Sequence, residues 1–254
     1  MMKRFLWLCT VVSLVVGFQG CKDGNSKRGG SHGQEGQPDL VVKELIDTIR
    51  FDVFNDDTCF ISFNVDAPIS GPEILVDSVL VFLNSELYEM FGTYLPFDTA
   101  TFSEGDMLTK DGGRLLSNYT EKFREPLKNP YGYAYQCIEL KLEAQAEKYV
   151  TYGLKRFGHN GMHYTSEKFY YTFDKRDGHR VKDLISHENL ARFSKENPGY
   201  DPELSDGPKE NCCGLLGDSV VFVYPFYFGT TESTESVACS KIVPYLSPEV
   251  QKLL

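Results

Sequence analysis

The chain has 254 residues, with 26 Lys and Arg against 36 Asp and Glu, and its formal net charge is −10 at neutral pH. This acidic balance argues against nucleic acid or an anionic membrane surface as the partner, because both carry negative charge. Hydrophobic residues make up 41% of the sequence, which is enough for a substantial core, so we expect a globular body.

Residues 1–20 are predicted to be a signal peptide. Lys3 and Arg4 form a short basic segment, and residues 5–18 (FLWLCTVVSLVVGF) contain no charge. This apolar run is typical of a signal-peptide core and is shorter than the roughly 18 residues of a membrane-spanning helix. Cys21 follows a glycine, which resembles the bacterial lipoprotein processing box, where the chain is cut before the cysteine and the cysteine is acylated. We therefore expect lipid attachment at Cys21; an ordinary secretory peptide is the alternative.

Residues 21–39 are predicted to form a flexible tether. The part from 22 to 39 has no aliphatic or aromatic residue and is rich in Gly and Ser, so it cannot bury enough surface to offset its ordering entropy. A flexible segment of this length spans on the order of 24 Å. Cleavage before Cys21 would also leave 24 basic against 36 acidic residues, a net charge of −12, because Lys3 and Arg4 are removed. Such a charge favours a cationic partner.

The remaining body is predicted to be an α+β fold of two sequential subdomains, residues 40–150 and 151–254, with antiparallel sheets packed against a few helices. Residues 49–65 are expected to form one or two strands. The segment Ser70-Gly-Pro-Glu73 has the pattern of a capping box with a proline in the first turn. Apolar residues then recur at three- and four-residue spacing up to Gly92, which predicts a long helix.

A second helix is predicted over residues 114–125. Residues 133–150 alternate between apolar and polar side chains, which predicts a long strand with one face in water. The elements expected after it are a strand at 169–173, a polar turn at 174–178 with a left-handed glycine, a helix that follows 181–186 and ends at 197, a strand at 220–228, a short strand at 242–245 and a terminal helix from 247.

Five cysteines follow the one expected to be acylated, so at most two disulfides can form among them. Strand alternation places Cys59 on an apolar face and Cys137 on a polar face, which counts against a bond between these two. Cys212 or Cys213 with Cys239 is the favoured disulfide, and free buried thiols are the alternative. Adjacent cysteines lack the CxxC spacing of zinc sites, so we predict no metal there.

Five segments of the C-terminal domain follow a known pattern: Phe169-Tyr-Tyr-Thr-Phe-Asp174, Asp177-Gly178, Val181-Lys-Asp-Leu-Ile185, Val221-Phe-Val-Tyr-Pro-Phe-Tyr-Phe-Gly229 and Ile242-Val-Pro-Tyr245. This pattern resembles the C-terminal domain of the RsiV-like extracytoplasmic family. That family includes lysozyme-sensing anti-sigma-factor ectodomains, accessory parts of some peptidoglycan deacetylases and many lipoproteins of unknown function. The resemblance implies a smaller β-rich domain before it, and a role in binding or sensing outside the cytoplasm.

Four residues make up a candidate functional turn region: His159, His163, Asp174 and Asp177. The histidines are four residues apart, the spacing of two metal ligands on one helix face, but the glycines around them disfavour a helix, and no third ligand is evident. We therefore favour a structural role for these histidines and predict no metal. The two aspartates are of the acid/base type, yet their turn, rich in charged residues, favours solvated turn chemistry.

The sequence contains no nucleophile elbow, phosphate loop or zinc-peptidase motif. We therefore favour a lipid-anchored binding or sensor protein of the bacterial cell envelope, on its periplasmic face or at the cell surface. It would be non-catalytic and need no cofactor, and its partner would be a protein, such as cationic lysozyme, or a cell-wall component. The alternative is a cell-envelope hydrolase, or an accessory subunit of a wall-modifying enzyme, with His163 and Asp174 or Asp177 in a cleft.

Overall fold

The structure of the protein is a computed structural model that describes residues 37–51, 59–94, 107–115, 135–159, 164–197, 213–224 and 233–254. The predicted signal peptide, Cys21 and the tether up to residue 36 lie outside these ranges. The segment Gly36–Leu254 is one compact unit. Within the described ranges, no helix combines the length and apolar character needed to cross a bilayer.

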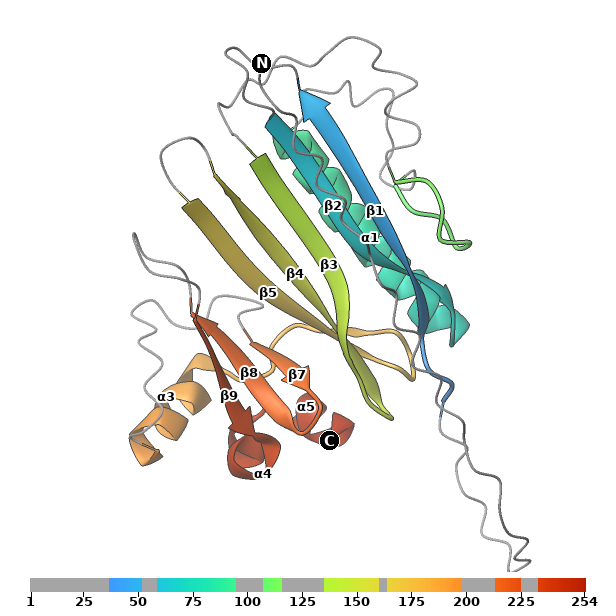
Figure 1. Ribbon diagram of the computed structural model, residues 1–254. Helices are drawn as coiled ribbons and strands as arrows, with labels where there is room; N and C mark the ends of the chain where they lie inside the picture. Colours follow the sequence, from blue (N-terminus) through green and yellow to red (C-terminus); the bar gives the residue numbers. More distant parts are fainter. Residues whose placement is uncertain are drawn as a thin grey trace, which may run out of the picture. The chain divides into compact units, whose positions relative to one another are not determined.

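Six strands form the larger sheet (Figure 1). They are, in spatial order, β1 (Val41–Phe51), β2 (Cys59–Ser70), β3 (Tyr135–Gln145), β4 (Tyr149–His159), β5 (Tyr164–Asp174) and β6 (Arg180–Val181). β2 and β3 are parallel, whereas every other neighbouring pair is antiparallel. Parallel neighbours need a crossover connection, and this one contains the helix α1 (Glu73–Tyr94). The predicted α+β class is confirmed, with a larger sheet that is mixed because of this crossover.

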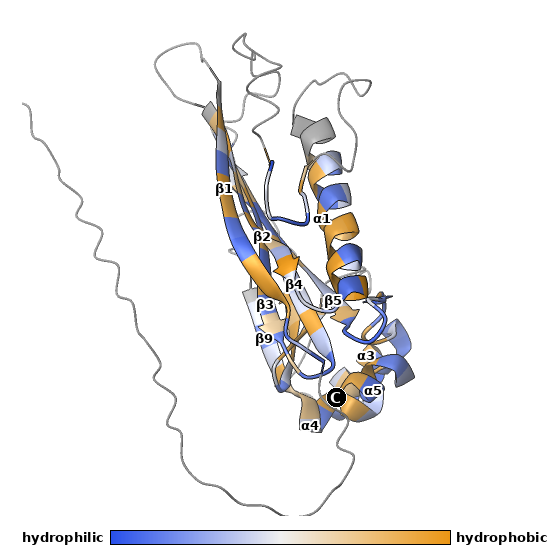
Figure 2. Ribbon diagram, turned by 90° about the vertical axis from the view of Figure 1, so that its right-hand side faces the viewer, coloured by the Kyte–Doolittle hydropathy of each residue, from blue (hydrophilic) through white to orange (hydrophobic). Residues whose placement is uncertain are grey.

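α1 lies along one face of the larger sheet (Figure 2). Leu75, Val79, Leu83 and Leu87, which are spaced four residues apart, are completely buried. They share a core with the inward residues of the strands, among them Phe63, Val65, Ile138, Leu140 and Phe173. Burial of each such side chain stabilises the fold by about 1.5–3 kcal/mol. The predicted long helix is confirmed, but it begins at Glu73, and the predicted capping box is wrong because Ser70 ends β2 and pairs with Val41.

The strand predicted over 133–150 is in fact two strands. β3 ends at Gln145 and β4 begins at Tyr149, and the amide of Ala146 donates to the Tyr149 carbonyl oxygen at 2.9 Å to close a tight turn. The polar segment between them is exposed. In sequence it therefore resembles the continuation of a half-exposed strand. The boundary expected between residues 150 and 151 falls inside β4, which pairs along its length with both β3 and β5. The helix predicted over 114–125 lies almost entirely outside the described residues.

A second, three-stranded antiparallel sheet packs with short helices around its own core. Its strands are β7 (Cys213–Leu216), β8 (Ser219–Tyr224) and β9 (Ser233–Ala238), and the helices are α3 (His187–Glu196), α4 (Cys239–Ile242), the 3-10 turn η2 (Val243–Tyr245) and α5 (Pro248–Leu253). A side chain added at Gly214 of β7 would begin 2.6 Å from Tyr170 of β5. Since Tyr171 contacts Phe82 of α1, with ring centroids 4.4 Å apart, its neighbour Tyr170 faces the other way. The small sheet therefore covers part of the sheet face opposite α1.

The helices α3 and α5 begin where their sequences predict. The hydroxyl oxygens of Ser186 and Ser247 accept hydrogen bonds from backbone amides in the first turns of these helices. The strand expected at 242–245 is wrong, because this segment ends α4 and forms η2. Pro244 has no N–H to give to a strand ladder, and the amide of Leu246 donates to the Val243 carbonyl oxygen at 3.1 Å. The strand expected at 220–228 is described as β8 up to Tyr224.

Candidate functional site

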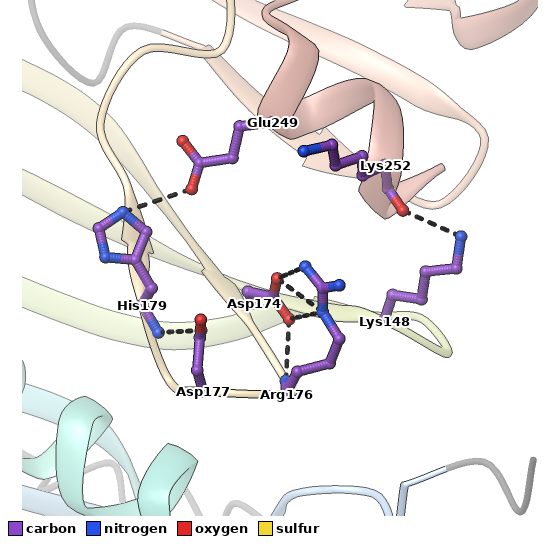
Figure 3. Close-up of polar contacts among 7 residues, drawn as sticks. All are labelled: Lys148, Asp174, Arg176, Asp177, His179, Glu249 and Lys252. Atoms are coloured by element: carbon purple, nitrogen blue, oxygen red, sulfur yellow. Dashed lines mark hydrogen bonds and ion pairs between the residues drawn. The ribbon is translucent and has the colours of Figure 1, made fainter.

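The predicted turn after β5 is held together by its own side chains (Figure 3). The buried carboxylate of Asp174 accepts hydrogen bonds from the Arg176 backbone amide at 2.8 Å and from two of its guanidinium nitrogens. Burial raises the pKa of the Asp174 carboxyl, but the Arg176 hydrogen bonds and charge outweigh it, so the pKa lies below its ordinary value. Asp177 accepts from the His179 amide at 2.9 Å. Both aspartates are therefore turn-forming residues.

The turn after β5 and the turn between β3 and β4 each contribute one contact to the C-terminal helix α5. His179 Nε2 lies 3.3 Å from a carboxylate oxygen of Glu249 in α5, and Lys148 Nζ donates to the Lys252 carbonyl oxygen at 3.0 Å (Figure 3). The predicted left-handed glycine is confirmed at Gly178, whose φ is +69°. These contacts give the residues of the turn a structural role in the fold.

The predicted functional turn region is not one site. His159 pairs with Tyr164 at one end of the β4–β5 ladder, and Asp174 pairs with Tyr149 at the other end. Ten residues along a strand span about 33 Å, so His159 and Asp174 cannot act on one small ligand. His163 lies outside the described residues.

Cys213 and Cys239 are both buried, and neither is in a disulfide. Cys213 lies opposite Phe222, which lies opposite Glu235, whereas Cys239 follows the far end of β9. The two are about 10 Å apart across the sheet and about 13 Å apart along it, whereas a disulfide requires Cα atoms within about 7 Å. Cys213 and Cys239 therefore do not pair, and Cys212 lies outside the described residues.

A groove opens between α1 and the β5–β6 turn, with a volume of about 570 Å³. Its walls come from α1 (Asp77, Ser78, Val81, Phe82, Ser85, Glu86 and Glu89) and from the turn side (Phe173, Gly178 and Arg180). We call this feature the α1 groove. Phe82 and Phe173 are buried and their rings meet edge to face at 5.4 Å, so they form an aromatic floor.

Three carboxylates and one guanidinium line the α1 groove. Glu86 is partly buried and lies 3.7 Å from Arg156. Burial raises the pKa of the Glu86 carboxyl above its ordinary value; Arg156 opposes this shift and Glu89 adds to it. Asp77 is more exposed and forms an ion pair with Lys110 at 2.5 Å.

Two aliphatic side chains project from the outward side of α1. Ile74 and Val81 are seven residues apart, hence on one helix face, and are 59% and 68% exposed. Val81 also lines the α1 groove. The outer side of α1 thus carries two exposed aliphatic side chains among its polar residues. The sequence of α1 does not mark Glu86 or Val81 as functional residues, because the apolar spacing of the helix is already explained by its packing on the core.

No protein-family model and no curated protein matches the chain. Two solved bacterial structures have a similar fold. One is a DUF3298 family protein from Pseudomonas aeruginosa PAO1, with a TM-score of 0.51 at 12% identity, covering 84% of this chain and 97% of that one. The other is a DUF3298 family member from Bacteroides fragilis NCTC 9343, with a TM-score of 0.54 at 14% identity, covering 85% of this chain and 99% of that one.

This protein has a DUF3298-like fold. At such identities the likeness concerns the fold alone. Because the matches cover nearly the whole of both solved chains, the DUF3298-like fold includes the larger sheet as well as the C-terminal region.

Substitution of Asp174 by asparagine should destabilise the protein by about 1–3 kcal/mol at pH 7, because the variant loses a charge-assisted set of hydrogen bonds. Since the folded-state pKa lies below its ordinary value, this stabilisation is fully present above about pH 4 and is lost as the pH falls through the folded-state pKa. Urea unfolding of both proteins at pH 7 and at pH 3 measures the difference, which should shrink at pH 3. Asp177→Asn, at an exposed position, is the control and should change stability much less.

Proposed function

We propose that the protein is a lipid-anchored, non-catalytic binding protein of the bacterial envelope, and that the α1 groove of its DUF3298-like body receives a basic side chain of a cationic protein ligand. The observation that carries this proposal is the arrangement of three carboxylates around an aromatic floor.

Lysine and arginine have an apolar stem and a charged end, and the α1 groove offers a surface for each. The stem would pack on Val81 and on the rings of Phe82 and Phe173. The charged end would reach Glu86 and Glu89, and at the partly buried Glu86 a charge-assisted hydrogen bond is stronger than at an open surface. The exposed Ile74 and Val81 would pack against apolar residues next to the basic one.

Two sequence features support an envelope role. The basic segment, apolar core and Cys21 are in register for lipoprotein processing. The C-terminal segments resemble the RsiV-like family, whose lysozyme-sensing members make lysozyme, a cationic wall-directed protein, the first ligand to test. The acidic body attracts such a partner over long range, and this attraction weakens as salt rises.

A pull-down with lysozyme tests this proposal. The exported chain, carrying Cys21→Ser so that it remains soluble, is immobilised and exposed to micromolar lysozyme at moderate salt. We expect lysozyme to be retained and to elute as salt is raised. No retention at micromolar protein would contradict lysozyme as the ligand.

A second candidate function, a carboxylate-based hydrolase of a wall polysaccharide, is favoured by one observation. Burial holds the pKa of Glu86 above its ordinary value, as in general acids, and the carboxylates of Asp77 and Glu89 line the same groove. The arrangement predicted from sequence gains no support, because Asp174 and Asp177 do not line this groove. Release of reducing sugar from cell-wall polysaccharide, abolished in Glu86→Gln, would establish the hydrolase; no release by the unmodified chain would dismiss it.

A further inference from the structure

The helix side of the α1 groove is formed by two neighbouring ridges of α1. Side chains four residues apart form a ridge along a helix, and the ridge of one helix packs into the space between two ridges of another. All seven α1 residues that line the groove belong to two such ridges, Asp77-Val81-Ser85-Glu89 and Ser78-Phe82-Glu86. The groove therefore has the surface pattern against which a second helix packs.

The N-terminal and middle parts of these ridges are mostly apolar or small. Val81 is 68% exposed, Ser85 is partly exposed, and Ile74, which extends the second ridge by one turn, is 59% exposed. At this end of α1, Asp77 forms an ion pair with Lys110, so its charge is balanced. A ligand thus meets a largely apolar surface from Ile74 to Ser85.

The other end of the groove is acidic at its rim, where Glu89 is exposed. Its basic groups lie deeper. The Nε atoms of Arg156 and Arg180 are buried, the Arg180 guanidinium lies 5.9 Å from the centre of the Phe82 ring, and Arg156 lies 3.7 Å from Glu86. Both guanidinium groups thus contact groove residues, whereas the exposed carboxylate at the rim favours a basic residue of the ligand.

We propose that the α1 groove is filled by an amphipathic helix of the cationic ligand. A ridge of aliphatic side chains of this helix lies over Val81 and Ser85 and ends in a lysine or arginine that reaches Glu89. Packing of this kind sets the two helices at about −50° to each other. The inference rests on the proposed binding of a cationic protein, and it adds the form in which that protein presents its basic residue.

The backbone of the groove walls selects a helix over an extended peptide. The N–H and C=O groups of α1 are bonded within the helix. On the turn side, the Gly178 amide donates to the Asp174 carbonyl oxygen at 2.9 Å, and Phe173 pairs with Arg180 in the β5–β6 ladder. β6, at the end of the sheet, is only two residues long. An extended peptide would bury its own backbone groups without enough partners, whereas a helix satisfies them internally.

A second copy of this chain is a poorer occupant than a basic helix. The sequence of α1 contains four carboxylates, Glu73, Asp77, Glu86 and Glu89, and no lysine, arginine or histidine. Two α1 helices packed on each other would bring these like charges together, which is unfavourable. The charge of α1 therefore favours a helix of opposite sign.

Titration calorimetry of the full Cys21→Ser chain with a synthetic helix tests this inference. The peptide has about 16 residues of alanine and glutamine, with three leucines at successive four-residue spacings and a lysine four residues after the last. We expect micromolar binding and, by circular dichroism, a gain of peptide helix on binding. The same peptide with a proline at its centre, off the ridge, cannot form the helix and should bind at least about tenfold more weakly.

A pair of matched variants locates the site. Val81→Ser removes an exposed aliphatic side chain from the groove, and Ile46→Ser removes one of nearly equal exposure, 67% against 68%, from β1. We expect Val81→Ser and Glu89→Gln to bind the peptide about tenfold more weakly, because each loses a contact with its ridge. Ile46→Ser should bind it as the unmodified chain does.

Four outcomes would overturn the helical form of the ligand. They are no binding of the peptide at millimolar concentration, equal binding of the proline peptide, equal affinity in Val81→Ser and Ile46→Ser, and a self-association that Val81→Ser abolishes, which would make a second copy the occupant. If lysozyme is retained but the peptide does not bind, the helix is wrong and the proposed function stands. Peptide binding without lysozyme retention would contradict lysozyme as the ligand and support the helix.

Discussion

Replacement of Gly178 by alanine should destabilise the protein by about 2–5 kcal/mol. Two effects combine. The residue has φ of +69°, a conformation that costs an L-residue about 1–2 kcal/mol. A Cβ there would also lie 2.4 Å from Ser78 Oγ and 2.7 Å from the Ile74 carbonyl oxygen, so α1 itself has to move. Urea unfolding at pH 7 measures the loss.

Gly217 provides a matched control for this substitution. Its φ is +64°, almost the same as that of Gly178, but an added Cβ would meet nothing within 4 Å. Gly217→Ala should therefore cost only the backbone strain, about 1–2 kcal/mol. The difference between the two variants isolates the close approach of the turn to α1. Equal losses would mean that the turn does not pack tightly against the helix, and the α1 groove would then lack a fixed wall.

Substitution of Cys21 by serine should move the protein from the membrane to the soluble fraction. A serine hydroxyl cannot take the thioether-linked lipid, and without a lipid nothing in the tether favours a bilayer. Partition of cell extracts into a detergent phase measures the change, which should be nearly complete. A Cys9→Ser variant, altered inside the predicted signal peptide, should remain in the detergent phase. A Cys21→Ser protein that still enters that phase would contradict lipid anchoring at this residue.

Local patterns in the sequence predict the elements whose stability is local. Apolar spacing predicts α1, Ser186 and Ser247 mark the starts of α3 and α5, and the turn at Asp174–Gly178 follows from short-range side-chain chemistry. Two local patterns were misleading. The turn between β3 and β4 has the alternation of a strand, and residues 242–245 have strand-forming side chains yet form a helical turn around Pro244.

The α1 groove could not be predicted in the same way. Glu86 belongs to α1 and Arg180 to β6, and only the sheet order brings these distant segments together. The register of the strands likewise fixes which residues of neighbouring strands lie opposite one another. The sequence draws attention to His159 through its spacing from His163, whereas its position opposite Tyr135 follows only from the pairing of β3 with β4. A single sequence specifies such pairings only through the whole fold.

Titration calorimetry of the Cys21→Ser chain with lysozyme at two salt concentrations tests most directly whether the α1 groove binds a cationic protein. We predict one-to-one binding that weakens with salt, and at least about tenfold weaker binding in Glu86→Gln, because a charge-assisted hydrogen bond is lost. Glu188→Gln, which removes the same charge from exposed α3, should retain the affinity of the unmodified chain. Absent binding, or equal affinities for the two variants, would contradict the proposal.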